Sequence, residues 1–157
     1  IIGILSSIVI GVGRRASESG NEARAKVELA AIATALESYK RQYGDYPRTN
    51  QTAALLKALV GRADANGESV NDRVLLDLEL FEFDGNDDPT TDHTLSLIDP
   101  WEQVYTYAYK PASSTAWSNP TPILYSRGPD GQEAATLTSG GYLDREATAN
   151  LDNIYAD

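Results

Sequence analysis

The first 46 residues join an uncharged apolar stretch to an amphipathic helix, and this join constrains the fold most. The first twelve residues carry no charge, and most of them are aliphatic. From residue 25 onward, apolar residues recur at alternating steps of four and three, which places them on one face of a helix. The residues of that face are Ala25, Leu29, Ile32, Leu36, Tyr39 and Tyr43. The pattern predicts a projecting helical segment over 1–24 and a domain over 25–157 that packs on the rest of the helix.

The predicted helix is too long for the domain it carries. A continuous helix through residue 45 would be about 65 Å long at 1.5 Å per residue, so its front end must be buried in something else. Twelve apolar residues cannot cross a bilayer core, which takes about 20, but the chain begins in mid-pattern without methionine. We interpret the stretch as part of a truncated membrane span, with the start of a buried helix as the alternative. Arg14 and Arg15 follow it. They mark a membrane interface, which suits long basic side chains, or are two solvated arginines on a helix.

Composition excludes several classes of function. The chain has 157 residues, 13 basic and 23 acidic side chains, and a net charge of −10. This length favours one domain with a modest core. Nucleic acid is not expected as a partner, because neutralising phosphates requires a basic patch. Without cysteine there can be no disulfide and no thiolate site. No phosphate loop, serine elbow or metal-binding helix motif is present, so we predict that the protein is not an enzyme.

The long helix should end near Gly44 and be followed by a second, shorter helix. Gly44 is a candidate for a left-handed cap, and Pro47 follows it. Thr49 or Asn50 can cap a helix over about residues 51–60, which would end at Gly61. Residues 50–52 also form an N-glycosylation sequon. We favour the capping role because a helical pattern follows directly.

The segment from residue 61 to residue 98 should contain a hairpin or another insertion. Residues 74–83 alternate apolar and acidic side chains, which is typical of a strand, and residues 84–92 form a polar turn. Part of this turn has the oxygen spacing of a calcium loop but lacks the glycine and the distal glutamate that such a loop needs. A solvated acidic turn is the better interpretation. His93 has no second nitrogen ligand nearby in the sequence and is expected at the surface.

From Asp99 onward the sequence predicts strands and then a long loop. Residues 104–109 and 123–125 should form an antiparallel pair that covers the helix, which makes the fold class α+β. Between Asp130 and Asp152 lie some twenty residues with weak periodicity. A loop of that length is usually mobile or held by a staple, and no disulfide is possible. Asp130 and the segment around Asp152 could bring together the hard oxygens that calcium requires. Asp144 is an alternative ligand, and an acidic tail in solvent is the competing interpretation.

Several of these motifs resemble the type IV pilin family and, more closely, the major pseudopilin of type II secretion systems. The similar segments are Ile1-Ile2-Gly3-Ile4-Leu5, residues 25–32, residues 39–47, Asp99-Pro100-Trp101 and residues 125–131. The helix exit over residues 39–47 is the most specific of them. The resemblance implies a pilin-like fold: a long N-terminal helix packed against a small antiparallel sheet, with a second short helix and a C-terminal loop.

The resemblance also implies a function, partners and site residues. The protein would polymerise into a pseudopilus filament that supports type II secretion, after residing in the bacterial inner membrane with its domain in the periplasm. Its partners would be other copies of itself, minor pilin-like subunits and inner-membrane assembly proteins. Calcium would be held by the Arg127 carbonyl and the side chains of Asp130, Asp152 and Asn153. The residues expected in the filament core are Ile1, Ile2, Ile4, Leu5, Ile8 and Val9.

Two alternatives to the secretion subunit remain open. The first is the major subunit of a surface type IV pilus, which the lack of a cysteine pair in the C-terminal loop disfavours. The second is a membrane-anchored periplasmic domain that does not polymerise. By sequence, only residues preceding Ile1 would distinguish such a domain from a pilin.

Overall fold

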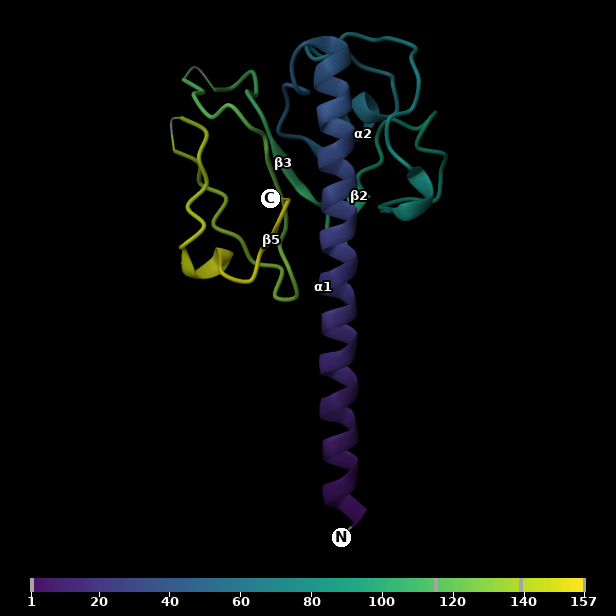
Figure 1. Cartoon of the computed structure of the whole chain (residues 1–157), viewed down its shortest axis with the longest axis vertical. Coiled ribbons are helices and arrows are strands. Elements are labelled where there is room, and N and C mark those ends of the chain that lie inside the picture. Colours follow the sequence, from purple (N-terminus) through teal and green to yellow (C-terminus); the bar gives the residue numbers. More distant parts are fainter. Residues whose placement is uncertain (1, 115, 139, 157) are drawn as a thin grey trace.

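A single long helix is the axis of the computed structural model, which describes residues 2–114, 116–138 and 140–156. Helix α1 spans Ile2–Tyr43, 42 residues, and its N-terminal half extends away from the rest of the protein (Figure 1). Side chains are described from residue 17 onward, so those of the predicted filament core lie outside the described residues. Among the helices described, none is long and apolar enough to cross a membrane.

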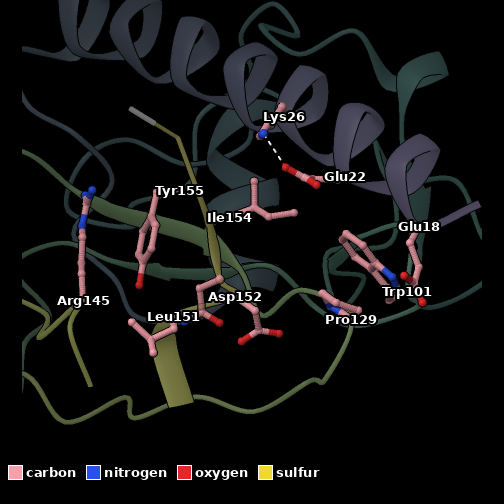
Figure 2. A pocket seen from close by; sticks show the side chains of 11 residues that line it. Glu18, Glu22, Lys26, Trp101, Pro129, Arg145, Leu151, Asp152, Ile154 and Tyr155 are labelled. Atoms are coloured by element: carbon pink, nitrogen blue, oxygen red, sulfur yellow. Dashed lines mark hydrogen bonds and ion pairs between the residues drawn. The ribbon is translucent and has the colours of Figure 1, made fainter. Parts of the chain in front are cut away.

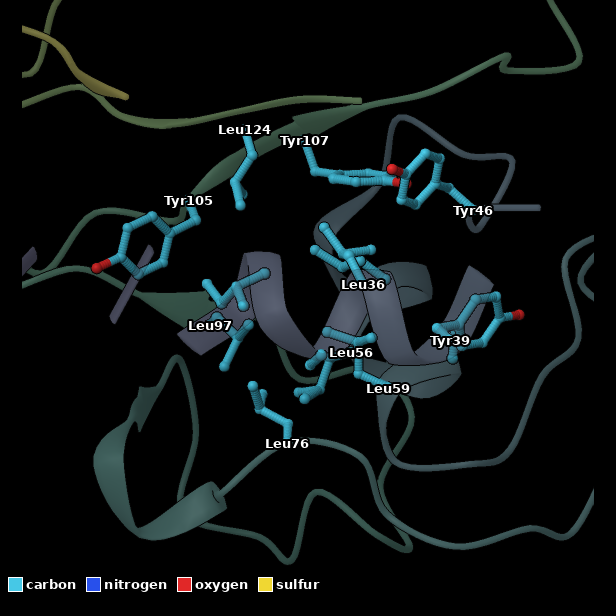
Figure 3. Close-up of a cluster of buried hydrophobic side chains, with 14 of the residues drawn as sticks. Leu36, Tyr39, Tyr46, Leu56, Leu59, Leu76, Leu97, Tyr105, Tyr107 and Leu124 are labelled. Carbon is cyan, nitrogen blue, oxygen red and sulfur yellow. The ribbon is translucent and has the colours of Figure 1, made fainter. Parts of the chain in front are cut away.

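The C-terminal half of α1 carries the core. Five of the six residues of the predicted face are fully or almost fully buried, and only Tyr43, in the last turn, is half-buried. The same face also buries the carboxylate of Glu28. Figure 3 shows Leu36 and Tyr39 among leucines and tyrosines from α2, the strands and the connecting loops. The helical periodicity therefore identified the packing face correctly.

The end of α1 and the start of the next helix differ in how well they were predicted. Gly44 has φ 83°, and its N–H donates to the carbonyl of Lys40 at 2.8 Å, as expected for a left-handed cap. Helix α2 spans Thr52–Leu59 and has Gln51 at its N-cap without a side-chain cap. The predicted cap is therefore wrong in detail: Thr49 Oγ1 accepts from Gln51 N at 3.0 Å, one step ahead of the helix.

The threonine of the sequon at residues 50–52 has a structural role. The Thr52 hydroxyl is buried and donates to the carbonyl of Tyr105 at 2.6 Å. This bond ties the first turn of α2 to the segment that enters β3.

The insertion forms a small hairpin beside the helix. Strand β1 (Glu82–Phe83) pairs antiparallel with β2 (Leu97–Ile98), and a short 3-10 helix η1 (Leu78–Leu80) precedes them. The predicted strand over residues 74–83 is wrong except for its last two residues. Within the connecting turn, Asp88 accepts from Thr90, and Asp92 accepts from Thr94. These carboxylates thus accept hydrogen bonds within local turns. His93 is exposed, as expected.

The C-terminal sheet packs against α1. Strands β3 (Thr106–Ala108), β4 (Ile123–Ser126) and β5 (Ile154–Tyr155) lie antiparallel in the order β3-β4-β5. Tyr107 pairs with Leu124, and Tyr125 pairs with Tyr155. The second 3-10 helix, η2 (Thr148–Asn150), leads toward β5. The predicted α+β pilin-like fold is confirmed, with β5 as an additional strand. The division at residues 24 and 25 stays a prediction.

We expect Leu36→Ala to lower the free energy of unfolding by about 2–5 kcal/mol, because it removes a buried side chain and leaves a cavity. Leu36 is 2% exposed and lies on the buried face of α1. Arg41→Ala, on the exposed side of the same helix, is the matched control. Urea denaturation measures both changes, and equal losses in the two variants would contradict the assigned face.

Candidate functional site

A groove lies between the middle of α1 and the C-terminal segment, and Asp152 and Asn153 of the predicted calcium ligands line it. Its volume is about 520 Å³. One wall is the helix, with Glu18, Glu22 and Lys26 (Figure 2). The residues opposite include Trp101, Pro129, Leu151, Asp152 and Tyr155. Charged and apolar side chains thus line the groove in equal number.

The charges of the groove are distributed unevenly along it. Lys26 Nζ pairs with Glu22 Oε1 at 2.5 Å, which offsets the charge of the lysine. Arg145 stacks on the Tyr155 ring, 4.2 Å from its centroid, at the end remote from Glu18 (Figure 2). Leu151 is 70% exposed, an unusual state for a large apolar side chain. Glu18 and Trp101 therefore mark an acidic and aromatic end of the groove.

Asp99 holds the tryptophan end in place. Its buried carboxylate accepts from the backbone N–H groups of Trp101 and Gln103, both at 3.0 Å, and from Ser126 Oγ at 2.5 Å. Ser126 Oγ in turn accepts from Gly128 N at 3.0 Å. One carboxylate therefore positions both the turn that carries Trp101 and the turn that leads to Asp130.

The turn after Trp101 contains a conformation that favours glycine. Glu102 has φ 63°, a left-handed conformation that costs a residue with a Cβ about 1–2 kcal/mol. The bonds to Asp99 on either side keep the turn closed despite this cost.

The predicted calcium ligands lie on two segments that the structure brings together. A Cβ at Gly128 would be 2.4 Å from the Asp152 carbonyl oxygen and 3.3 Å from its Oδ2, so the turn after Arg127 touches Asp152. Gly128 has φ 66°, and this close approach requires a glycine. Asp130 is exposed, and its Oδ1 accepts from Gln132 N at 2.8 Å.

Two buried polar atoms near this contact have no partner within the described part of the chain. They are Asn153 Oδ1 and Arg127 Nε. Asn153 is only 8% exposed, and its Nδ2 donates to Asn150 Oδ1 at 3.1 Å. Arg127 Nη2 lies 3.5 Å from the Val104 carbonyl. An unpaired buried oxygen is costly, so Asn153 Oδ1 is the atom in this region most in need of a partner.

Among the described residues, no group of three or more Asp, Glu, His or Cys side chains is placed to hold a metal ion. The predicted ligand set is of a different kind, since it combines two carboxylates with an amide oxygen and a carbonyl oxygen. Asp144, the alternative ligand, accepts from Glu146 N at 3.0 Å within its own turn.

Asn150 holds the long C-terminal loop together, and the sequence analysis missed it. The side chain is 1% exposed. Its Oδ1 accepts from Ala134 N at 2.8 Å as well as from Asn153, and its Nδ2 donates to the carbonyls of Ala134 at 3.2 Å and Asp144 at 2.6 Å. Nothing in the surrounding sequence distinguishes this residue from other loop asparagines.

The far end of the loop rests on Trp117. A Cβ at Gly141 would lie 2.4 Å from the Trp117 ring, and Asn119 Nδ2 donates to the Gly141 carbonyl at 2.9 Å. Within the loop, Leu137 and Leu143 pair with each other in an isolated antiparallel β-bridge. At the near end, burial and a hydrogen bond to Glu133 raise the pKa of Tyr125, so its hydroxyl stays a donor to the loop.

We expect Asn150→Ala to destabilise the C-terminal loop, because it removes three hydrogen bonds to backbone groups of Ala134 and Asp144, each worth about 0.5–1.5 kcal/mol. Limited proteolysis should show faster cleavage between residues 131 and 149, and urea denaturation should show lower stability. Asn86→Ala, at an exposed asparagine of the acidic turn, is the control. Cleavage rates that match the control would contradict the role of Asn150.

The comparison with known proteins bears on the N-terminal part of the chain. The family described as type II secretion system (T2SS), protein G matches residues 14–77. This region contains most of α1, all of α2 and the segment leading to η1, and it is less than half of the chain. It confirms the predicted resemblance to the major pseudopilin. No curated protein and no solved structure matches the chain.

Proposed function

Because the chain is similar to type II secretion system protein G over residues 14–77 and has a pilin-like fold, we propose that it is a structural subunit of a pseudopilus and acts by polymerising. The observation that carries this proposal is the projecting helix. At 1.5 Å per residue α1 is about 63 Å long, and its face is buried by the domain only from Ala25 onward among the side chains described.

The energetics of the apolar stretch support polymerisation. Burying one large aliphatic side chain is worth about 1.5–3 kcal/mol, and eight of the first twelve residues are Ile, Leu or Val. The membrane would cover them before assembly, and other copies would cover them afterwards. Ile1, Ile2, Ile4, Leu5, Ile8 and Val9 are the proposed filament core.

The proposed setting follows from the same similarity. The subunit would be anchored in the inner membrane with its domain in the periplasm, and would assemble with minor pilin-like subunits and inner-membrane assembly proteins. A structural role, not an enzymatic one, fits such a subunit. A surface pilus is the second candidate. The Asn150 contacts favour the secretion subunit, since they support the C-terminal loop without the cysteine pair found in many surface pilins.

We expect the double substitution Ile4→Asp and Ile8→Asp to abolish filaments while leaving the domain folded, because a charge in an apolar core costs several kcal/mol. Electron microscopy counts the filaments, and circular dichroism checks the fold. Ile4→Val with Ile8→Val is the control and should assemble normally. Filaments of the aspartate variant at the natural yield would overturn the proposed core.

Calcium is the proposed ligand of the C-terminal loop. Calcium takes six to eight oxygen ligands. The unpaired buried Oδ1 of Asn153 and the contact of Asp152 with the turn after Arg127 fit such an ion. The Arg127 carbonyl and the Asp130 carboxylate would be the remaining protein ligands. The ion would supply positive charge that holds the two ends of the loop together.

The expected stabilisation by calcium is modest. With an affinity of about 10⁻⁴ M and calcium at millimolar concentration, linkage gives roughly 1.4 kcal/mol. Because the Asn150 contacts already hold part of the loop, the ion would order mainly the residues next to Asp130 and Asp152.

We expect Asp130→Ala to weaken calcium binding sharply, because it removes a ligand and a negative charge from the site. Titration calorimetry measures the binding, with Asp87→Ala, an exposed carboxylate of the distant acidic turn, as the control. Chelator should also speed proteolysis of the loop in the natural protein and have little effect on the variant. Calcium heats of the natural protein indistinguishable from dilution would exclude the site.

A further inference from the structure

We propose that the groove of Figure 2 binds the helical segment around Arg14 and Arg15 of a second copy of this chain. This inference rests on the proposed polymerisation and adds the surface through which neighbouring copies would meet. The occupant is identified by its chemistry: two adjacent basic residues that follow an apolar helix.

The groove matches that segment in charge. Glu18 and Glu22 lie along its helical wall, and Asp152 lies opposite them (Figure 2). The only basic side chains among its lining residues are Lys26 and Arg145. Lys26 is paired with Glu22 at 2.5 Å, and Arg145 stacks on Tyr155 at the end remote from Glu18. The Glu18 end of the groove therefore favours a cation from outside.

The groove also matches the segment in its apolar character. Trp101 and the exposed Pro129 lie next to Glu18 (Figure 2), where they could contact the end of the apolar stretch at Val12. Leu151 is 70% exposed and further along the groove. An exposed apolar surface bordered by charges is typical of a protein interface.

The geometry of parallel helices brings these groups together. A displacement of four residues, about 6 Å along the axis at 1.5 Å per residue, places Arg14 level with Glu18 of a neighbour. A displacement of seven residues, about 10.5 Å, instead places Arg15 level with Glu22. Each copy then offers its groove to one neighbour and its arginines to another. Repeating such a head-to-tail contact yields an open helical assembly.

A contact within one helix competes with this arrangement. Arg14 and Glu18 are four residues apart and could pair in the same chain, but a basic residue that precedes an acidic one gives the weaker orientation. An experiment must therefore separate pairing within one chain from pairing between copies.

Two variants, one with the charges of the segment reversed and one with the charges of the groove reversed, distinguish pairing within one chain from pairing between copies. Variant A carries Arg14→Glu and Arg15→Glu, and variant B carries Glu18→Arg and Glu22→Arg, both in the whole protein. Each variant alone should lose filaments by roughly tenfold or more, because like charges then meet at every contact. Their mixture should recover filaments, because the segment of each variant then complements the groove of the other. Pairing within one chain predicts no recovery, and that result would overturn the proposal.

Cross-linking gives an independent test, since the natural chain has no cysteine. Val12→Cys in one copy and Pro129→Cys in another should form a disulfide in assembled filaments, which requires Cα atoms about 4.4–6.8 Å apart. Asn86→Cys, on the acidic turn, replaces Pro129→Cys as the control and should not cross-link. Filaments that form without the 12–129 cross-link would refute this contact and leave the proposed function standing. If the natural protein forms no filaments, the proposed function fails and this inference fails with it.

Discussion

The fold depends on one buried carboxylate, that of Glu28, which joins α1 to the segment entering β3 and, through Arg24, to the insertion. Glu28 is 2% exposed; Tyr105 donates to its Oε2 at 2.6 Å, and Arg24 pairs with its Oε1 at 2.6 Å. Arg24 also pairs with Glu82 of β1 at 3.1 Å. Burial raises the pKa of Tyr105, and the bond to Glu28 adds to the rise. A buried charge that loses its partner costs about 3–5 kcal/mol, so Glu28 fixes how α1 sits against β3.

Tyrosine hydroxyls also join distant segments elsewhere in the core. Tyr39 donates to the Ala63 carbonyl and Tyr107 to the Pro47 carbonyl, both at 2.9 Å. Each bond joins elements far apart in the sequence and satisfies a buried backbone oxygen, which would otherwise be costly. A chain with no cysteine and short strands thus obtains its cross-connections from aromatic side chains, whose rings also fill the core.

The predictability of each feature follows from the range of the interactions behind it. The helical face, the Gly44 cap and the β3–β4 pair were predicted because they depend on local periodicity and turn chemistry. The predicted strand over residues 74–83 was wrong because Leu76 and Phe81 reach the core without a partner strand. Only Glu82 and Phe83 pair with another strand. Asn150 and β5 could not be predicted, since both are defined by contacts with distant segments. The calcium ligands stay a prediction, although the turn after Arg127 adjoins Asp152. The groove beside them had no sequence signal.

The position of Asp152 couples the two proposals made for this region. Asp152 touches the turn after Arg127 and also lines the groove beside α1. A cation at the loop and a neighbouring helix in the groove would therefore act on the same short segment. Any effect of one ligand on the affinity of the other would then be reciprocal. The subunit carries a net charge of −10, so bound calcium would also reduce the repulsion between copies. Order in the C-terminal loop and assembly of the filament would then be parts of one equilibrium, with the loop as the element that both ligands stabilise.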